Sequence, residues 1–308
     1  MSGVLGRFAP SPSGRMHLGN IFSCLMAWLS ARSQDGRILL RIEDLDPQRT
    51  SRAYADQLMR DLEYLGLTWD QGPYWQSERD EYYEDCLLRL SAQGLVYPCF
   101  CTRAQLHPGP ASAPHASDGE YIYSGRCRGL SAEQIAGLKA ARAPALRLRA
   151  EGVESFTDRH YGPQTCHLQR DCGDFILRRS DGVFAYQLAV TADDGLMGVT
   201  EVVRGRDLLS SCGRQLYLYR LLGLTPPKFA HIPMLLSKDG RRLSKRDKDM
   251  DLSMLKTRFN SAELLGRLAY LGGQLPTPQP ARAQDLVKVF SWDKLPKEDL
   301  FLPDGLFG

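Results

Sequence analysis

The N-terminal third of the chain alternates short apolar runs with helical patterns, and this order restricts the possible folds more than any other feature. An apolar run from Val4 to Phe8 stops at a turn rich in proline and glycine, and a helical pattern follows from Leu18 to Arg32. A second apolar run, Arg37 to Ile42, is followed by helical patterns over residues 51–65 and 78–93. Because parallel strands need long crossover connections, this order predicts an α/β domain with a parallel sheet.

Strand signals return in the second half of the chain. Residues 174–179 and 183–191 are predicted as strands joined by a glycine-containing turn. Apolar runs at 199–203 and 232–236 predict two more strands, with a helix over 208–222 between them.

Composition bears mainly on location and partners. The formal net charge of the 308 residues is +3, so a nucleic-acid partner must meet a local basic face. No run of about eighteen apolar residues occurs, so we expect neither a membrane span nor a signal peptide. Eight cysteines do not make a disulfide scaffold in a chain this long, and the close pair Cys99 and Cys101 indicates metal chemistry in a reducing compartment. We therefore expect a cytoplasmic protein.

The first candidate site is the turn between the first strand and the first helix, Arg7 to Asn20. A helix that begins just after His17 offers free N–H groups and the positive end of its dipole, which suits a nucleotide phosphate. Gly19 would let the backbone approach a ligand closely. The same residues also fit a strand–helix turn without a ligand.

The second candidate site is the segment Gly240 to Lys248, with five cations and one acid in a glycine-led loop. Such a loop could close on a polyphosphate and bring Lys245 beside it. The alternative is a solvated run of charges.

Taken together, these two segments resemble the HIGH and KMSKS signatures of class I aminoacyl-tRNA synthetases. Three further blocks resemble those of glutamyl enzymes and occur in the same order, Arg41 to Arg49, Asp193 to Asp207 and His231 to Leu236. Two positions depart from the usual pattern. Asn20 stands where the first signature has a second histidine, and Arg242 stands where the second signature begins with lysine.

The resemblance implies a class I synthetase fold, a Rossmann-like parallel sheet interrupted by an inserted zinc-binding subdomain. We expect residues 1–96 and 174–248 to form the two halves of the catalytic domain, the second ending in the lysine loop. Residues 97–173, which are rich in proline, glycine and alanine in their first part, would form the insertion, of the kind that handles RNA acceptor ends. Residues 249–308 would form a short helical C-terminal region without an anticodon-binding domain.

The implied chemistry is attack of a glutamate carboxylate on the α-phosphorus of ATP. The enzyme then needs to supply position and charge stabilisation rather than a nucleophile. The resemblance assigns catalysis to His17 and Lys245, with Mg²⁺ shielding the leaving pyrophosphate. The expected ATP contacts are His17, Gly19, Asn20 and Lys245.

Glutamate carries one ammonium and two carboxylates, so its site should present one carboxylate and at least one or two arginines. The resemblance maps these roles onto Glu43 for the ammonium and onto Arg7 and Arg204 for the carboxylates. The alternative for each is an ion pair of the core or surface, and for Tyr186 it is ordinary packing. The full set of expected glutamate contacts is Arg7, Phe8, Ala9, Pro10, Ser11, Glu43, Tyr186 and Arg204.

A candidate metal site is formed by two short cysteine motifs, Cys99-Phe-Cys101 and Tyr123-Ser-Gly-Arg-Cys127. Zinc prefers four ligands in a tetrahedron, and three cysteines leave one place open. The resemblance suggests Tyr123 for that place, with one Zn²⁺ per chain. Three reduced cysteines without a metal are the alternative. The competing fourth ligands are His107, His115, Cys166 and Cys172.

Only a short region follows the lysine loop, and a short glutamyl-type chain with this cysteine pattern resembles the glutamyl-queuosine tRNA(Asp) synthetases. The resemblance implies that glutamate is activated without tRNA and then esterified to the queuosine base in the anticodon stem-loop of tRNA(Asp). The expected partners are therefore glutamate, ATP and this RNA, with no membrane, and we expect a monomer. Two alternatives stay open, a glutamyl-tRNA synthetase that charges an acceptor end and a non-catalytic descendant that binds glutamate or RNA.

Overall fold

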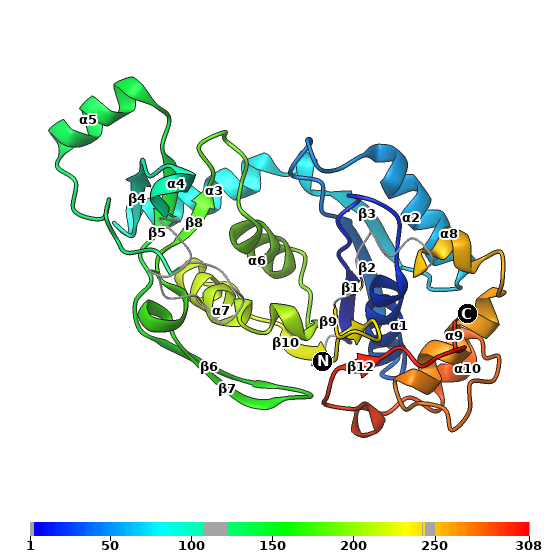
Figure 1. Ribbon diagram of the computed structural model, residues 1–308. Helices are drawn as coiled ribbons and strands as arrows, with labels where there is room; N and C mark the ends of the chain where they lie inside the picture. The colour runs from blue at the N-terminus through cyan, green and yellow to red at the C-terminus, as the bar shows by residue number, and fades with distance from the viewer. Residues whose placement is uncertain (1–2, 107–121, 242, 244–249, 308) are drawn as a thin grey trace.

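The computed structural model describes residues 3–106, 122–241, 243 and 250–307. The predicted parallel sheet is confirmed, and it is assembled from two distant parts of the chain (Figure 1). The first part is a three-stranded parallel sheet of β1 (Leu5–Phe8), β2 (Arg37–Ile42) and β3 (Gln71–Trp75). The second is the parallel pair β9 (Glu201–Gly205) and β10 (Lys228–Ile232). The Thr200 amide donates to the Leu5 carbonyl at 2.9 Å, which joins β9 to β1.

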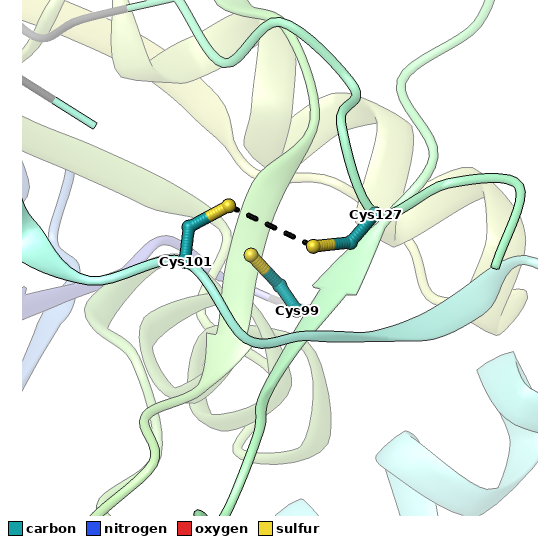
Figure 2. A group of neighbouring side chains, drawn as sticks. All are labelled: Cys99, Cys101 and Cys127. Atoms are coloured by element: carbon teal, nitrogen blue, oxygen red, sulfur yellow. Dashed lines mark hydrogen bonds between the residues drawn. The ribbon is translucent and has the colours of Figure 1, made fainter. Parts of the chain in front are cut away.

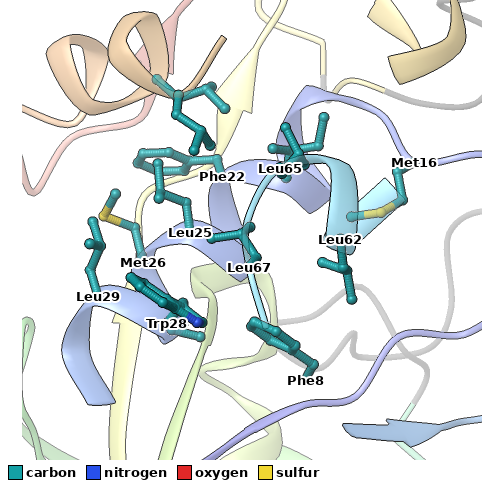
Figure 3. Close-up of a cluster of buried hydrophobic side chains, with 14 of the residues drawn as sticks. Phe8, Met16, Phe22, Leu25, Met26, Trp28, Leu29, Leu62, Leu65 and Leu67 are labelled. Atoms are coloured by element: carbon teal, nitrogen blue, oxygen red, sulfur yellow. The ribbon is translucent and has the colours of Figure 1, made fainter. Parts of the chain in front are cut away.

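Helix α1 (Leu18–Arg32) packs against both β1 and β9 and holds the two parts together. Its buried side chains, which include Phe22, Leu25, Met26 and Trp28, belong to one apolar cluster with residues at and beyond the end of α2 (Arg52–Tyr64), some of which Figure 3 shows. This apolar cluster fixes the start of α1 relative to the end of β1, where the phosphate-binding turn was predicted.

A second apolar cluster lies between the sheet and the insertion. It is built by α3 (Asp80–Ala92), α6 (Tyr186–Leu196) and α7 (Ser211–Leu222), together with strands of the insertion. Short 3-10 or π turns complete the connections: η1 (Gln76–Glu78), η2 (Leu168–Cys172) and η3 (Arg206–Leu208).

The described residues of the insertion form an antiparallel sheet, a hairpin and two α-helices. The sheet has the order β4 (Val96–Cys99), β5 (Ala145–Leu148), β8 (Phe175–Arg178), so its last strand lies just beyond residue 173. The hairpin of β6 (Val153–Asp158) and β7 (Gly162–His167) extends back toward β10 (Figure 1). The helices are α4 (Arg103–Leu106) and α5 (Ala132–Ala141).

The C-terminal region is helical, as predicted, with α8 (Leu252–Leu255), α9 (Ser261–Leu271), α10 (Ala283–Val287) and η5 (Trp292–Lys294). It then returns to the catalytic domain, because β12 (Leu300–Phe301) pairs in parallel with β11 (Leu235–Leu236). Among the described residues, no helix has the length and apolar character needed to cross a membrane.

Two predicted strands are wrong in detail. Residues 183–191 form only an isolated bridge at Phe184, and from Tyr186 the chain is helical. The helix is buried on all sides over residues 188–194, including Asp193 and Asp194. The run 232–236 is divided between β10 and β11 by Pro233, which has no N–H to donate to a ladder.

Candidate active site

A cavity of about 540 Å³ opens at the carboxyl ends of β1, β2, β9 and β10. This edge of a parallel sheet is where α/β folds generally bind ligands. The cavity is lined by the turn before α1, the residue after β2, the first residue of α6 and the end of β9. Every residue predicted to contact glutamate lines it: Arg7, Phe8, Ala9, Pro10, Ser11, Glu43, Tyr186 and Arg204.

The predicted ATP contacts His17, Gly19 and Asn20 line the same cavity and form the N-terminal cap of α1. The Gly19 amide donates to His17 Nδ1 at 3.1 Å, and the His17 amide donates to Asn20 Oδ1 at 3.2 Å. Because Nδ1 accepts a hydrogen bond, a neutral His17 carries its proton on Nε2. A Cβ at residue 19 would lie 3.1 Å from the His17 ring, so glycine here admits the imidazole as well as any ligand.

Glu43 is held at the end of β2 by a buried ion-pair network. Arg41 is 0% exposed, and its Nη2 donates to Glu43 Oε1 at 3.1 Å. The Nη1 atom of Arg41 donates to Asp194 Oδ1 at 2.6 Å, and its Nε lies 3.5 Å from Asp193 Oδ2. Burial raises the pKa of Glu43, and the nearby cations Arg41 and Arg7 oppose that shift. Glu43 therefore lines the cavity with part of its hydrogen-bonding capacity already used by Arg41.

Arg7 and Arg204 are largely buried side chains of the cavity wall. Arg7 Nη1 donates to the Val203 carbonyl at 3.3 Å, and its Nε lies 3.7 Å from Asp194 Oδ1. Arg204 Nη1 donates to the Tyr186 hydroxyl at 3.5 Å. Tyr186 is 37% exposed and lines the cavity from the start of α6, rather than from a strand as predicted.

The guanidinium of Arg204 also forms a hydrogen bond with the buried side chain of His231. Arg204 Nε donates to His231 Nε2 at 3.0 Å, and His231 Nδ1 lies 2.6 Å from Asp158 Oδ2. Burial lowers the pKa of His231 to about 4, against the raising effect of Asp158. His231 belonged to a recognised block, but its role was not predicted, and Asp158 was missed entirely. A histidine inside the apolar strand β10 was the one local signal available.

Lys245 lies outside the described residues, so its predicted role rests on its neighbours in the chain. Leu243 lines the cavity. Beyond the loop, Asp251 bridges to His17, and the Leu252 amide donates to the Met16 carbonyl at 2.9 Å. Leu243 on one side of the undescribed residues thus lies at the cavity, and Asp251 and Leu252 on the other side contact the turn that carries His17.

The candidate metal site is the cysteine cluster in the insertion (Figure 2). The sulfur atoms of Cys99, Cys101 and Cys127 lie within 4.8 Å of one another, with Cys101 and Cys127 3.6 Å apart. Tetrahedral zinc with sulfur ligands at about 2.3 Å would separate those sulfurs by about 3.8 Å. The Tyr123 hydroxyl lies 3.5 Å from the Cys99 sulfur and 3.6 Å from the Cys101 sulfur. The donor set fits a metal ion.

Two of the competing fourth ligands lie elsewhere. The sulfurs of Cys166 and Cys172 are 3.3 Å from each other, beside η2, and neither joins the group of three cysteines. His107 and His115 lie outside the described residues. Tyr123 is therefore the described side chain that best fits the fourth place.

The fold agrees with comparisons to known proteins. The sequence matches the family of class I tRNA synthetases (E and Q), catalytic domain, over residues 3–273. A relative from Symbiobacterium thermophilum named glutamyl-Q tRNA(Asp) synthetase is 47% identical over 97% of this chain and 96% of its own. One of the same name from Nitratidesulfovibrio vulgaris is 46% identical with the same coverage.

Solved structures show the same fold. A glutamate tRNA ligase from Elizabethkingia meningosepticum, in complex with its amino acid, matches 99% of this chain and 68% of its own, with 25% identity and a TM-score of 0.83. The chain therefore belongs to the class I tRNA synthetases of the E and Q type and, among them, to the glutamyl-Q tRNA(Asp) synthetase family.

Proposed function

We propose that this protein activates glutamate with ATP, without tRNA, and transfers the glutamyl group to the queuosine base in the anticodon of tRNA(Asp). The observation that carries the activation step is the arrangement of charges around the cavity. Arg7, Arg204 and Glu43 line it together, which matches a ligand with two carboxylates and one ammonium. The related glutamate tRNA ligase, whose structure contains its amino acid, supports a binding role for this cavity.

In this proposal Glu43 takes the ammonium of glutamate, and Arg7 and Arg204 take its carboxylates. Phe8, Ala9, Pro10, Ser11 and Tyr186 complete the walls. The reacting carboxylate attacks the α-phosphorus of ATP, a P–O bond forms, and pyrophosphate leaves. The residues of the chain contribute position and charge, since no nucleophilic side chain is needed.

The N-terminus of α1 is the proposed phosphate site. Gly19 and Asn20 lie in its first turn, and His17 offers its Nε2–H to the phosphates. Lys245 follows Leu243 by two residues, a reach of at most about 7 Å along the backbone, and Leu243 lines the cavity. Lys245 is therefore the proposed partner of the charge that spreads over the phosphates during transfer, with Mg²⁺ on the leaving pyrophosphate.

The RNA step rests on the names of the relatives, which match this chain over nearly its whole length. We assign residues 1–96 and 174–248 to catalysis, residues 97–173 to the RNA-facing insertion, and residues 249–308 to a helical C-terminal region. Zinc held by Cys99, Cys101, Tyr123 and Cys127 would stabilise the insertion. The enzyme would act as a monomer in the cytoplasm, which holds tRNA and keeps thiolates reduced.

ATP–pyrophosphate exchange with purified protein and no RNA tests the activation step. Glutamate should support exchange, and glutamine and aspartate should support it much more weakly. Glutamine lacks the second charge that the arginines pair with, and aspartate is shorter by one methylene. An absolute requirement for tRNA would favour a glutamyl-tRNA synthetase that charges acceptor ends. No exchange under any condition would favour a non-catalytic descendant.

A further inference from the structure

We propose that Asp158 and His231 are positioning residues that orient the guanidinium of Arg204 for a substrate carboxylate, so that the insertion fixes part of the amino-acid site. This inference rests on the proposed function for the identity of the substrate. Asp158 ends strand β6 of the insertion, His231 lies in β10, and Arg204 lies in β9. The three side chains form one continuous hydrogen-bonded chain from the insertion to the cavity wall.

The three hydrogen-bonded side chains are shielded from water. Asp158 is 1% exposed, His231 is 0% exposed and Arg204 is 5% exposed. The contacts are short, 2.6 Å between Asp158 Oδ2 and His231 Nδ1 and 3.0 Å between His231 Nε2 and Arg204 Nε. Hydrogen bonds to charged groups in such surroundings are strong, and a buried donor left without an acceptor is costly.

The donors and acceptors fix the tautomer of His231. A guanidinium can only donate, so His231 Nε2 must accept and the ring proton must lie on Nδ1, where it is donated to Asp158. The charged and titratable groups that face the ring are Asp158, Arg204, Arg7 and Cys212. Burial and the two arginines favour the neutral ring, which is the form that can accept from Arg204.

The remaining atoms of Arg204 explain what this bond achieves. Its Nη2 donates to the Leu208 carbonyl at 3.3 Å, to Gln215 Oε1 at 2.9 Å and to the Cys212 sulfur at 3.1 Å. Since the guanidinium is planar, anchoring Nε and Nη2 fixes the direction of Nη1. That atom contacts the Tyr186 hydroxyl at the cavity wall. His231 thus supplies one of the two anchors that direct Nη1 toward the ligand.

The surroundings of Asp158 make an isosteric test possible. Its Oδ1 accepts from the backbone amides of His160 at 3.0 Å, Tyr161 at 2.9 Å and His231 at 3.3 Å. In Asp158→Asn the amide oxygen must stay on those three donors, so the NH₂ group faces His231 Nδ1. The ring proton must then move to Nε2. There it faces the Nε–H of Arg204, so two donors meet and the hydrogen bond between them is lost. The substitution keeps the shape of the side chain at residue 158 but removes the hydrogen bond that anchors Arg204 Nε.

The expected effect is selective for the amino acid. In ATP–pyrophosphate exchange, Asp158→Asn should raise the KM for glutamate by about tenfold to a hundredfold, the range for leaving a buried charged donor without its acceptor. The KM for ATP should stay within about twofold, because no hydrogen bond of Arg204 among the described residues involves the phosphate-binding turn at α1. The matched control is Glu201→Gln. Glu201 is also a buried carboxylate joining β9 to the insertion, through Arg159 at 2.9 Å, but it does not contact Arg204. Its glutamate KM should stay within about twofold of the parent value.

A spectroscopic readout separates positioning from a merely structural role. In protein labelled with ¹⁵N-histidine, the His231 proton should be on Nδ1 in the parent and on Nε2 in Asp158→Asn, with the signal identified by its loss in His231→Gln. The Gln side chain can accept from Arg204 without help from Asp158. In the His231→Gln background, therefore, Asp158→Asn should change the glutamate KM by less than about threefold.

An unchanged glutamate KM in a folded Asp158→Asn protein would overturn the inference, and so would a ring proton that stays on Nδ1. If Asp158→Asn does not fold, His231→Gln alone must raise the glutamate KM less than His231→Leu, which cannot accept a hydrogen bond. Equal effects of these two variants would also overturn it. If the parent protein activates no amino acid, the proposed function fails, and the tautomer measurement still decides the fate of the Asp158–His231–Arg204 chain.

Discussion

Arg41 Nη2 donates to Glu43 Oε1 at 3.1 Å, while Arg41 Nη1 donates to Asp194 at 2.6 Å. The buried Arg41 side chain thus holds Glu43, which lines the cavity, and Asp194 balances the charge of Arg41. Among the described residues, Arg41 does not itself line the cavity, whereas Glu43 does.

Removing the charge of Glu43 should therefore weaken glutamate binding without unfolding the protein. In Glu43→Gln we expect the KM for glutamate to rise by about tenfold to a hundredfold, since a charge-assisted hydrogen bond to the ammonium is lost. This KM is measured from the rate of ATP–pyrophosphate exchange at varied glutamate concentrations. Glu84→Gln, which removes a half-exposed ion pair with Arg178, is the control and should leave the KM unchanged. Equal KM values in the two variants would assign Glu43 a purely structural ion pair.

Lys245 should act on the rate rather than on glutamate affinity. We expect Lys245→Ala to lower the rate of exchange by about a hundredfold or more, because one charged group that stabilises the transition state is lost. The KM for glutamate should change little. Lys238→Ala, at a surface ion pair with Asp304, is the control. Undiminished turnover in Lys245→Ala would mean that the loop is only a solvated run of cations.

The cysteine cluster should bind one zinc per chain, measured by elemental analysis of freshly purified protein. Cys101→Ser should release the metal and lower the unfolding temperature, because structural zinc contributes folding free energy. Cys166→Ser is the matched control, since that sulfur contacts Cys172 outside the cluster, and it should keep its zinc. Absence of zinc in the parent protein would argue against the site. Zinc retained at full affinity in Tyr123→Phe would mean that the fourth ligand is another residue.

Stability should fall as the pH drops from 7 to 5, in part through His231. Its pKa in the folded protein is about 4, below the ordinary value of 6.5, so the unfolded chain binds a proton that the folded chain does not. The stability from this residue is complete above pH 6.5 and is lost as the pH falls, by at most about 1.4 kcal/mol per pH unit. Urea unfolding at pH 7, 6 and 5 should show a shallower dependence in His231→Gln. If the free energy of unfolding depends on pH in the same way in the parent protein and in His231→Gln, His231 is not the source of the pH dependence.

The sequence was most informative where local signals are strong. The bounds of α1, Leu18–Arg32, and of β2, Arg37–Ile42, follow from apolar periodicity and from the turns that flank them. A strand was predicted over Val183 to Thr191 because five of these nine residues are β-branched or aromatic, which is typical of strands, although the alanines and Leu188 favour a helix. The α6 helix also brings Asp193 and Asp194 to Arg41, a tertiary contact that no local sequence signal reveals.

The cavity residues could be named in advance because they lie in motifs, although their roles in binding stay predictions. The Asp158–His231 pair could not be named. The two residues are 73 positions apart, and nothing around Asp158 distinguishes it from other turn aspartates. Only the fold brings β6 of the insertion beside β10.

The most direct measurement follows labelled glutamate into RNA. Purified protein is given glutamate, ATP and tRNA(Asp) that either carries or lacks queuosine, and the labelled RNA is cut so that the anticodon fragment separates from the 3′ end. We predict label only in the queuosine-containing tRNA, within the anticodon fragment, and equal labelling of an isolated queuosine-containing anticodon stem-loop. Label at the 3′ end, or equal labelling of tRNA without queuosine, would contradict the account and make the protein a glutamyl-tRNA synthetase that charges acceptor ends.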